Sequence, residues 1–245
     1  MINIFPEQVF FFRCHPKIQC FNACCQDLHQ ILTPYDIIRL KHHFQIDSSI
    51  FLKTYTRTYI GPETGLPVVV LKTKSHMDLR CIFVSEEGCL VYPDRPASCR
   101  YYPLARLVSR SRETGKISAS YMLMKEAHCM GHNDQKGFLC EQTLEKWLDS
   151  QELANDDNYN DRMLEIIAVK NQAGIKDLSA DQKKLFFMCC YDIDSFQDYA
   201  VNDQLFSEKL DMHCSFDGDL QWLERALAWL KNNFLKISVL NNCHV

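Results

Sequence analysis

The stretch CHPKIQCFNACC, residues 14–25, places four cysteines within twelve residues, among turn-forming and charged side chains. Three residues separate Cys20 from Cys24, and this gap allows two thiolates on one turn to reach a single metal ion. Cys25 follows Cys24 directly, and the side chains of adjacent residues tend to diverge. The Cys24–Cys25 doublet is therefore expected either to divide between two metals or to face two atoms of one cluster.

Eight of the thirteen cysteines of the chain lie before residue 131. One tetrahedral Zn²⁺ ion or one four-iron cluster takes four thiolates, so eight exceed what a single site needs. The count predicts two sites, or one site with spare thiols for chemistry. The metal ligands predicted from this clustering are Cys14, Cys20, Cys24, Cys25, Cys81, Cys89, Cys99 and Cys129.

The other five cysteines are interpreted as structural. Cys189 and Cys190 follow an apolar helical run, residues 185–188, where a free cysteine behaves as a small buried hydrophobe. Bound metal is therefore expected to depend on the first set of cysteines and not on the second. The second set consists of Cys140, Cys189, Cys190, Cys214 and Cys243.

Composition and charge narrow the class of protein. The chain has 245 residues with 27 Lys and Arg against 31 Asp and Glu, a net charge of −4, which disfavours nucleic-acid binding because phosphate contacts need clustered positive charge. The longest apolar runs are too short to span a bilayer, and no signal-peptide pattern is present. We therefore expect a cytoplasmic protein with neither a membrane nor a nucleic-acid partner. A cytoplasm keeps thiols reduced, so the cysteines indicate metal binding rather than disulfides.

The cysteine spacings leave the choice between zinc and iron open. The paired Cys-x-x-Cys knuckles of a zinc ribbon are missing, and so is the run of gaps found in bacterial ferredoxins. A radical S-adenosylmethionine triplet that starts at Cys20 and Cys24 would need a third cysteine where Asp27 stands. An iron–sulfur cluster and zinc both remain, with the iron–sulfur cluster slightly favoured.

Local signals predict short strands and capped helices in the first half of the chain. Residues 5–30 are too interrupted for regular structure. Thr33, Pro34 and Asp36 then fit the N-cap, the first position and the first turn of a helix. A second helix is expected from Ser48 to about Arg57, a strand over residues 66–72, short strands around 81–84 and 89–92, a turn or short helix leading to Cys99, and a hairpin over 104–112 and 117–125.

From about residue 138 onward the pattern is helical. Ser179 and Gln182 form a capping box, and the last helix carries an apolar stripe at three- and four-residue steps. The sequence therefore predicts an α+β fold. A small Cys-rich, metal-centred domain with short antiparallel strands and helices occupies residues 1–135, and a helical region over residues 136–245 packs on it. The stripe consists of Leu220, Leu223, Leu227, Leu230, Phe234 and Ile237.

Several segments of roughly the first 150 residues occur in the order typical of one known family. They are residues 12–14, 20–25, 32–40, 65–71, 81–83, 88–92 and 94–103, followed by Cys129. This ordered combination resembles the YkgJ-type cysteine-cluster family, the CxxCxxCC proteins described as zinc- or iron-chelating. The first gap departs from the family pattern, because five residues separate Cys14 from Cys20 where the family name implies two.

The resemblance implies a metal-chelating protein whose physiological role is open, with a metal ion or cluster as its ligand. Flagellin lysine N-methylase is similar in its cysteine motif, so the alternative is an S-adenosylmethionine-dependent enzyme that methylates lysine on a protein substrate. None of the eight glycines forms the Gly-x-Gly turn of a Rossmann-type cofactor site, and no Walker loop is present. Metal-binding module and modifying enzyme therefore both stay open, and no catalytic residue is predicted.

Basic residues and histidines accompany the predicted ligands. Arg95 and Arg100 stand inside the matching segment around Cys99, where their N–H donors would offset the negative charge of a thiolate site. His15, His128 and His132 border ligand cysteines and are candidates to replace a thiolate, although a histidine in such a position is more often not a ligand.

Overall fold

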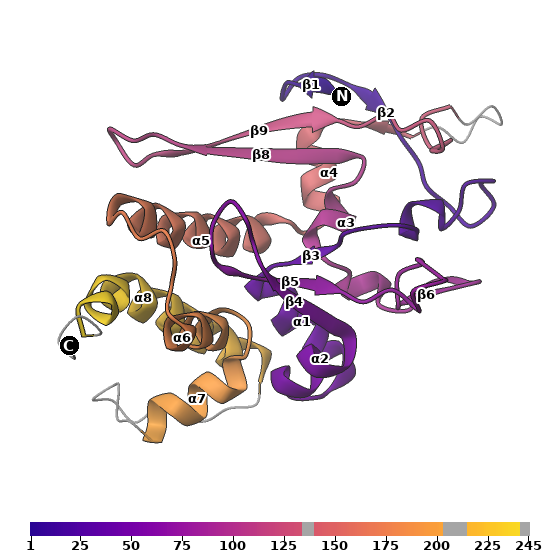
Figure 1. Ribbon diagram of the computed structural model, residues 1–245. Helices are drawn as coiled ribbons and strands as arrows, with labels where there is room; N and C mark the ends of the chain where they lie inside the picture. Colours follow the sequence, from indigo (N-terminus) through magenta and orange to yellow (C-terminus); the bar gives the residue numbers. More distant parts are fainter. Residues whose placement is uncertain (134–139, 203–214, 241–245) are drawn as a thin grey trace. The chain divides into compact units, whose positions relative to one another are not determined.

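The computed structural model describes residues 1–133, 140–202 and 215–240, with the side chains of the last helix described as far as Asn233. Short strands and helices are mixed up to Gln142, helices alone follow among the described residues, and every strand pairing in these residues is antiparallel (Figure 1). The α+β class and the helical character of the C-terminal region are confirmed. None of the described helices combines the length and apolarity that crossing a bilayer would require.

The chain divides into two compact units, and each unit combines two separate stretches of the sequence. Unit 1 comprises residues 1–30 and 72–157, and unit 2 comprises residues 31–71 and 158–245. The sequence had indicated one boundary near residue 135. Residues 31–71 instead group with the C-terminal helices, because the first two helices and the central strand of this segment pack against helices that come much later in the chain.

Unit 1 is built on a three-stranded sheet in the order β1-β9-β8. The predicted hairpin forms its larger part, and Gly115 in the connecting turn has a φ of 71°, in the left-handed region that favours glycine. Two smaller pairs, β10 with β2 and β6 with β7, complete the strands. The bounds are Ile2–Ile4 (β1), Phe10–Phe11 (β2), Val84–Ser85 (β6), Gly88–Cys89 (β7), Leu104–Arg110 (β8), Ile117–Leu123 (β9) and Glu141–Gln142 (β10).

The core of unit 1 gathers residues from both ends of this unit's sequence. Phe10 and Phe12 are buried against Leu104 and Leu144, and the ring of Trp147 meets that of Phe12 edge-on at a centroid distance of 5.5 Å. This packing fixes the start of the loop that carries the first cysteines. The helical elements of unit 1 are η1 (Ala23–Cys25), η2 (Tyr92–Asp94), α3 (Ala97–Tyr101), α4 (Leu144–Ser150) and the first residues of α5 (Ala154–Gln172).

Unit 2 combines a small sheet in the order β3-β5-β4 with the remaining helices. The predicted caps are confirmed: the Thr33 hydroxyl accepts from the Asp36 amide, the Ser179 hydroxyl accepts from the Gln182 amide, and each motif is a complete capping box. The bounds are Ile31–Leu32 (β3), Thr56–Ile60 (β4), Pro67–Leu71 (β5), Pro34–Phe44 (α1), Ser48–Tyr55 (α2), Ala180–Cys190 (α6), Ile193–Asn202 (α7) and Phe216–Leu240 (α8).

The last helix buries its predicted stripe. Leu223, Leu227 and Leu230 are each 3 % exposed or less, so this face of α8 belongs to the core of unit 2. The side chains of Phe234 and Ile237 lie outside the described residues. Cys189 and Cys190 in α6 are also buried, which confirms their interpretation as small hydrophobes, whereas Cys214 and Cys243 lie outside the described residues.

Candidate metal centre

All eight predicted ligand cysteines belong to unit 1. Cys14 and Cys20 lie in the loop between β2 and η1, and Cys24 and Cys25 are in η1 itself. The others are distributed over later elements of the same unit: Cys81 just before β6, Cys89 in β7, Cys99 in α3 and Cys129 in the loop after β9. Residues more than one hundred positions apart in the sequence are thus placed in one compact unit.

One set of contacts brings the loop of Cys14 and Cys20 to the loop of Cys129. The Arg13 amide donates to the Gly131 carbonyl at 3.0 Å, which places the residues next to Cys14 and to Cys129 side by side. The Met130 amide donates to the Cys20 Sγ at 3.2 Å. Cys20 is thus already an acceptor for a backbone N–H, a contact that also stabilises a thiolate.

A second set of contacts joins the doublet to the β6–β7 hairpin. The Cys81 amide donates to the Cys25 carbonyl at 2.7 Å. The Asn22 side chain donates to the Ser85 carbonyl at 3.0 Å, and Asn22 itself has a φ of 64°, a conformation that asparagine tolerates. Cys89 pairs with Val84 across the hairpin, so the doublet, Cys81 and Cys89 are held together by backbone geometry.

The thiols of these two sets interact with one another electrostatically. Burial, together with the neighbouring thiols of Cys24, Cys20 and Cys129, raises the pKa of Cys14 to about 11. Burial likewise raises the pKa of Cys81, to which Cys89 also contributes. Cys14 and Cys81 therefore lie close enough to other thiols that charge on one thiol disfavours charge on its neighbour.

Cys24 and Cys25 shift each other's pKa in opposite directions. A hydrogen bond from the Cys25 thiol lowers the pKa of Cys24 to about 7, against the opposing effect of burial. The same bond, together with burial, raises the pKa of Cys25. Cys25 also interacts with Cys81 and Cys99, and the Cys99 thiol donates to the Gln30 side-chain oxygen at 3.5 Å. Cys24 therefore interacts electrostatically with Cys14, and Cys25 interacts with Cys81 and Cys99.

The sulfur donors are of the type that a thiophilic metal binds, and all of them belong to one compact unit. Zinc and iron–sulfur clusters prefer thiolate ligands, and eight thiols, seven half-buried and that of Cys14 exposed, lie in one unit. No group of three or more His, Cys, Asp or Glu side chains in the described part of the chain is arranged closely enough to hold an ion as it stands. Closing such a site would need rotation of cysteine side chains, and metal binding supplies the free energy for rearrangements of this kind.

The two arginines expected near the cysteines differ in their surroundings. The charge of Arg95 acts on both Cys14 and Cys89, where it opposes the raising of the pKa by burial. Its guanidinium lies 4.0 Å from the Tyr92 ring centroid and donates to the Tyr92 carbonyl at 2.7 Å. This placement suits the expected role of Arg95, which would offset the negative charge of bound thiolates.

The partners of Arg100 differ from those that the sequence led us to expect. Its side chain is 2 % exposed and forms a salt bridge with Asp156, which is fully buried. It also donates to the carbonyls of Arg95, Gln151 and Glu152 at 3.1, 2.8 and 3.2 Å. The donors of Arg100 therefore hold α3 to the start of α5, and Arg100 supports Cys99 through the fold rather than through the sulfur.

The histidines near the cysteines already have partners. The His132 ring nitrogens contact the Phe11 and Met124 carbonyls, and His15 accepts from the Lys17 amide at 3.2 Å. His128 lies 3.5 Å from the Glu126 carboxylate.

Two further residues beside the thiols were not singled out from the sequence: Gln30, which contacts Cys99, and Tyr102, whose pKa is raised by burial and by Cys129. Neither carries a spacing signal that could have identified it.

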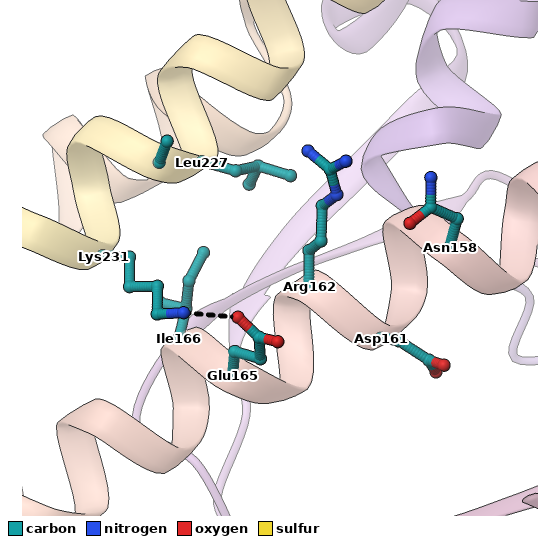
Figure 2. Close-up of a pocket in the computed structure, with 8 residues that line it drawn as sticks. Asn158, Asp161, Arg162, Glu165, Ile166, Leu227 and Lys231 are labelled. Atoms are coloured by element: carbon teal, nitrogen blue, oxygen red, sulfur yellow. Dashed lines mark hydrogen bonds and ion pairs between the residues drawn. The ribbon is translucent and has the colours of Figure 1, made fainter. Parts of the chain in front are cut away.

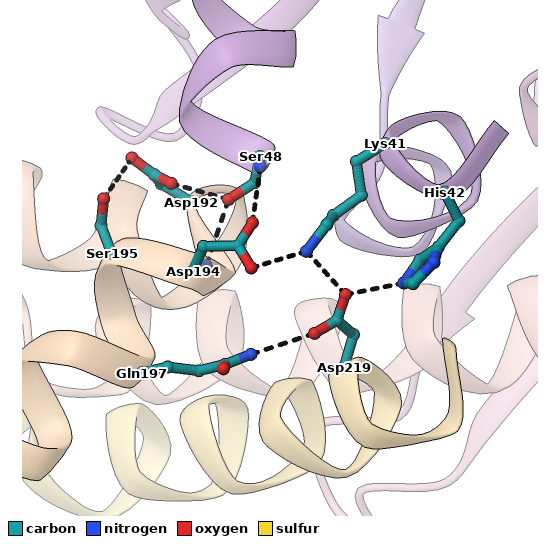
Figure 3. Close-up of polar contacts among 8 residues, drawn as sticks. All are labelled: Lys41, His42, Ser48, Asp192, Asp194, Ser195, Gln197 and Asp219. Atoms are coloured by element: carbon teal, nitrogen blue, oxygen red, sulfur yellow. Dashed lines mark hydrogen bonds and ion pairs between the residues drawn. The ribbon is translucent and has the colours of Figure 1, made fainter. Parts of the chain in front are cut away.

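Unit 2 contains a buried polar network in which Lys41 is held between two carboxylates. The Lys41 ammonium lies 2.6 Å from Asp194 and 2.7 Å from Asp219, and Figure 3 shows it pointing between the two carboxylates. Asp219 also contacts His42 at 2.8 Å and accepts from Gln197 at 3.0 Å. Burial lowers the pKa of Lys41, but its hydrogen bonds to both carboxylates outweigh burial and raise it. A lysine held protonated in this way stabilises the fold and is not a nucleophile.

A pocket of about 300 Å³ lies between α5 and α8 within unit 2 (Figure 2). Lys231 and Glu165 pair across it at 2.6 Å, and Arg162 pairs with Glu224 at 3.1 Å. Its charged groups therefore neutralise one another, and they are about half exposed. The thiol group of unit 1 remains the candidate functional site.

Comparison with known families agrees with this choice. Residues 13–130 match the family described as "CxxCxxCC: Putative zinc- or iron-chelating domain". All eight candidate ligands lie within this matched segment. No curated protein and no solved structure matched the chain.

Proposed function

We propose that this protein binds zinc or an iron–sulfur cluster through the eight cysteines of unit 1. The observation that carries the proposal is their gathering: eight thiols from segments spread over residues 14–129 lie in one unit, where backbone hydrogen bonds join the segments that carry them. Cys189 and Cys190 are buried and belong to unit 2. The match to a family described as chelating zinc or iron supports the same function.

In this proposal the chain's own residues supply ligands and charge compensation. Cysteine thiolates bind the metal, the Met130 amide stabilises the Cys20 sulfur, and Arg95 offsets negative charge near Cys14 and Cys89. A bound metal would cross-link the segments that carry the cysteines. An iron–sulfur cluster would also supply redox chemistry. Free thiols of this kind suit a reducing compartment, and we propose the cytoplasm. Nothing in the site or the comparisons favours the lysine methylase alternative.

The proposal is tested by metal content. Anaerobically purified protein and its Cys89→Ser variant are analysed for zinc, iron and acid-labile sulfide. The wild type should contain metal, and Cys89→Ser should contain less. Cys189→Ala is the matched control, because its thiol is buried in a helix of unit 2. Equal metal content in wild type and Cys89→Ser, or loss in Cys189→Ala alone, would contradict the ligand assignment.

A further inference from the structure

The β8–β9 hairpin of unit 1 has an open strand edge. Strand β8 ends its sheet, and among the described residues β9 is the strand that pairs with it (Figure 1). At the turn the Ser111 amide donates to the Lys116 carbonyl at 2.9 Å, so these two residues face each other across the hairpin. Because the direction of the backbone groups alternates along an antiparallel strand, Val108 and Arg110 direct their N–H and C=O groups away from β9.

The half of β8 nearer the turn is also accessible. Leu107 is 49 % exposed and Ser109 is exposed, whereas Leu104 at the other end of the strand is buried in the core of unit 1. Val108 and Arg110 are half-buried. A strand edge with outward-directed backbone groups is a template on which a strand of another chain can pair.

Positive charge gathers at the turn end of the same hairpin. Residues 107–120 carry three cations and one carboxylate, namely Arg110, Arg112, Lys116 and Glu113. The Arg110 Nε has no hydrogen-bond partner among the described residues, and a Cβ on Gly115 in the turn would lie 3.0 Å from the Arg110 Nη2. This segment therefore has a net charge of +2 in a chain whose net charge is −4, and its charge is complementary to that of an acidic partner.

From the open edge and its charge we infer that β8 binds an extended, acidic segment of a partner protein, which joins the sheet as a further strand. The backbone groups of Val108 and Arg110 pair with those of the segment, and the nearby cations attract its carboxylates. A second copy of β8 is disfavoured, because antiparallel pairing with Val108 opposite itself would place Arg106 of one copy opposite Arg110 of the other. The inference does not depend on the proposed metal centre.

Peptide binding to the full chain tests the inference. Two fluorescently labelled peptides are compared by anisotropy, one that alternates Glu with Val and one that alternates Lys with Val. The Glu peptide should bind, more weakly as the salt concentration rises, and the Lys peptide should not bind. Amide exchange followed by NMR should show slower exchange at Val108 and Arg110 in the complex. No binding of the Glu peptide, equal binding of both peptides, or unchanged exchange at these two amides would overturn the inference.

Variants separate backbone pairing from charge. Val108→Pro removes a donor that points away from β9, so it should raise the Kd for the Glu peptide about three- to tenfold while the hairpin keeps its own bonds. Arg112→Glu combined with Lys116→Glu keeps the backbone donors and should raise the Kd about tenfold at low salt. Lys146→Glu is the matched control, because it reverses an exposed charge in α4, and it should leave the Kd unchanged.

Three further outcomes would contradict strand addition by an acidic segment. The first is an unchanged Kd in Val108→Pro, which would show attraction by charge alone. The second is tighter binding of a DNA oligonucleotide than of the Glu peptide, which would assign the cations to phosphate. The third is a concentration-dependent dimer of the wild type that Val108→Pro abolishes, which would assign the edge to a second copy. If Val108→Pro lowers the urea midpoint, the amide exchange of the wild-type complex decides the question.

Discussion

The structure gives Arg100 a role that can be measured without any metal. Replacing it by methionine keeps an unbranched side chain of similar length but removes the cation from beside Asp156. It also removes the donor from the three carbonyls that Arg100 contacts. The change therefore leaves a buried carboxylate and several buried acceptors without this donor.

The expected loss is large because both members of the pair are buried, with side-chain exposures of 2 % and 0 %. Removing one partner of a buried ion pair typically costs about 3–5 kcal/mol. A natural domain has roughly 5–15 kcal/mol of total stability, so Arg100→Met should remove about a fifth of it or more. Asp156→Asn keeps an acceptor for the guanidinium and should cost less, about 1.5–3 kcal/mol.

Urea unfolding followed by circular dichroism, at the same metal content for every variant, measures these losses. The double variant Arg100→Met/Asp156→Asn should lose less than the sum of the two single losses, because the two residues share one interaction. Arg80→Met is the control: Arg80 pairs with Asp78 through two nitrogens, but the pair is exposed to solvent. A midpoint for Arg100→Met as close to the wild type as that of Arg80→Met would refute the reasoning.

Two further predictions concern other parts of the chain. In Gly131→Ala the new Cβ would lie 2.6 Å from the Phe12 ring, and such overpacking should cost about 1–3 kcal/mol in urea unfolding. An unchanged midpoint would contradict it. Burial raises the pKa of Asp194, but the hydrogen bonds from Lys41 and Ser48 outweigh burial and lower it, so its contribution is present above about pH 4 and lost as pH falls through the folded pKa. Asp194→Asn should therefore flatten the fall in stability as the pH drops below about 4, and an equally steep fall would contradict this account.

The features that the sequence predicted correctly are those set by local chemistry. The helices that begin after Thr33 and Ser179 are predicted by capping residues three positions apart in the sequence. The β8–β9 hairpin follows from a short turn between alternating residues. Buried Cys189 and Cys190 follow from the apolar run that precedes them. In each case the residues that decide the structure are neighbours in the chain.

The features that the sequence did not predict depend on distant residues. Strand β4 was not expected, because Thr56–Ile60 is ordered by pairing with β5 rather than by an apolar pattern of its own. Arg100 was expected beside sulfur, but its acceptors lie more than fifty positions later in the chain and nothing near Cys99 reveals them. The grouping of residues 31–71 with the C-terminal helices is non-local in the same way.

For the candidate site, the clustering of cysteines predicts which of them act as ligands, but not which segments of the chain approach one another. The partners of Cys14 and of Cys25 come from loops whose approach is decided by single backbone contacts, such as the bond from Cys81 to Cys25. Tyr102 and Gln30 were found only once the chain had folded around the thiols. Ligand type is thus readable from the sequence, whereas ligand grouping requires the fold.

Elemental analysis combined with an absorption spectrum of the anaerobically purified, untagged protein tests the central claim most directly. The account predicts bound metal: either zinc in a colourless protein, or iron with acid-labile sulfide and a broad band near about 400 nm. With metal bound, the eight cysteines of unit 1 should resist alkylation while Cys140 reacts. Protein without zinc or iron, in which all of these thiols react freely, would contradict the account.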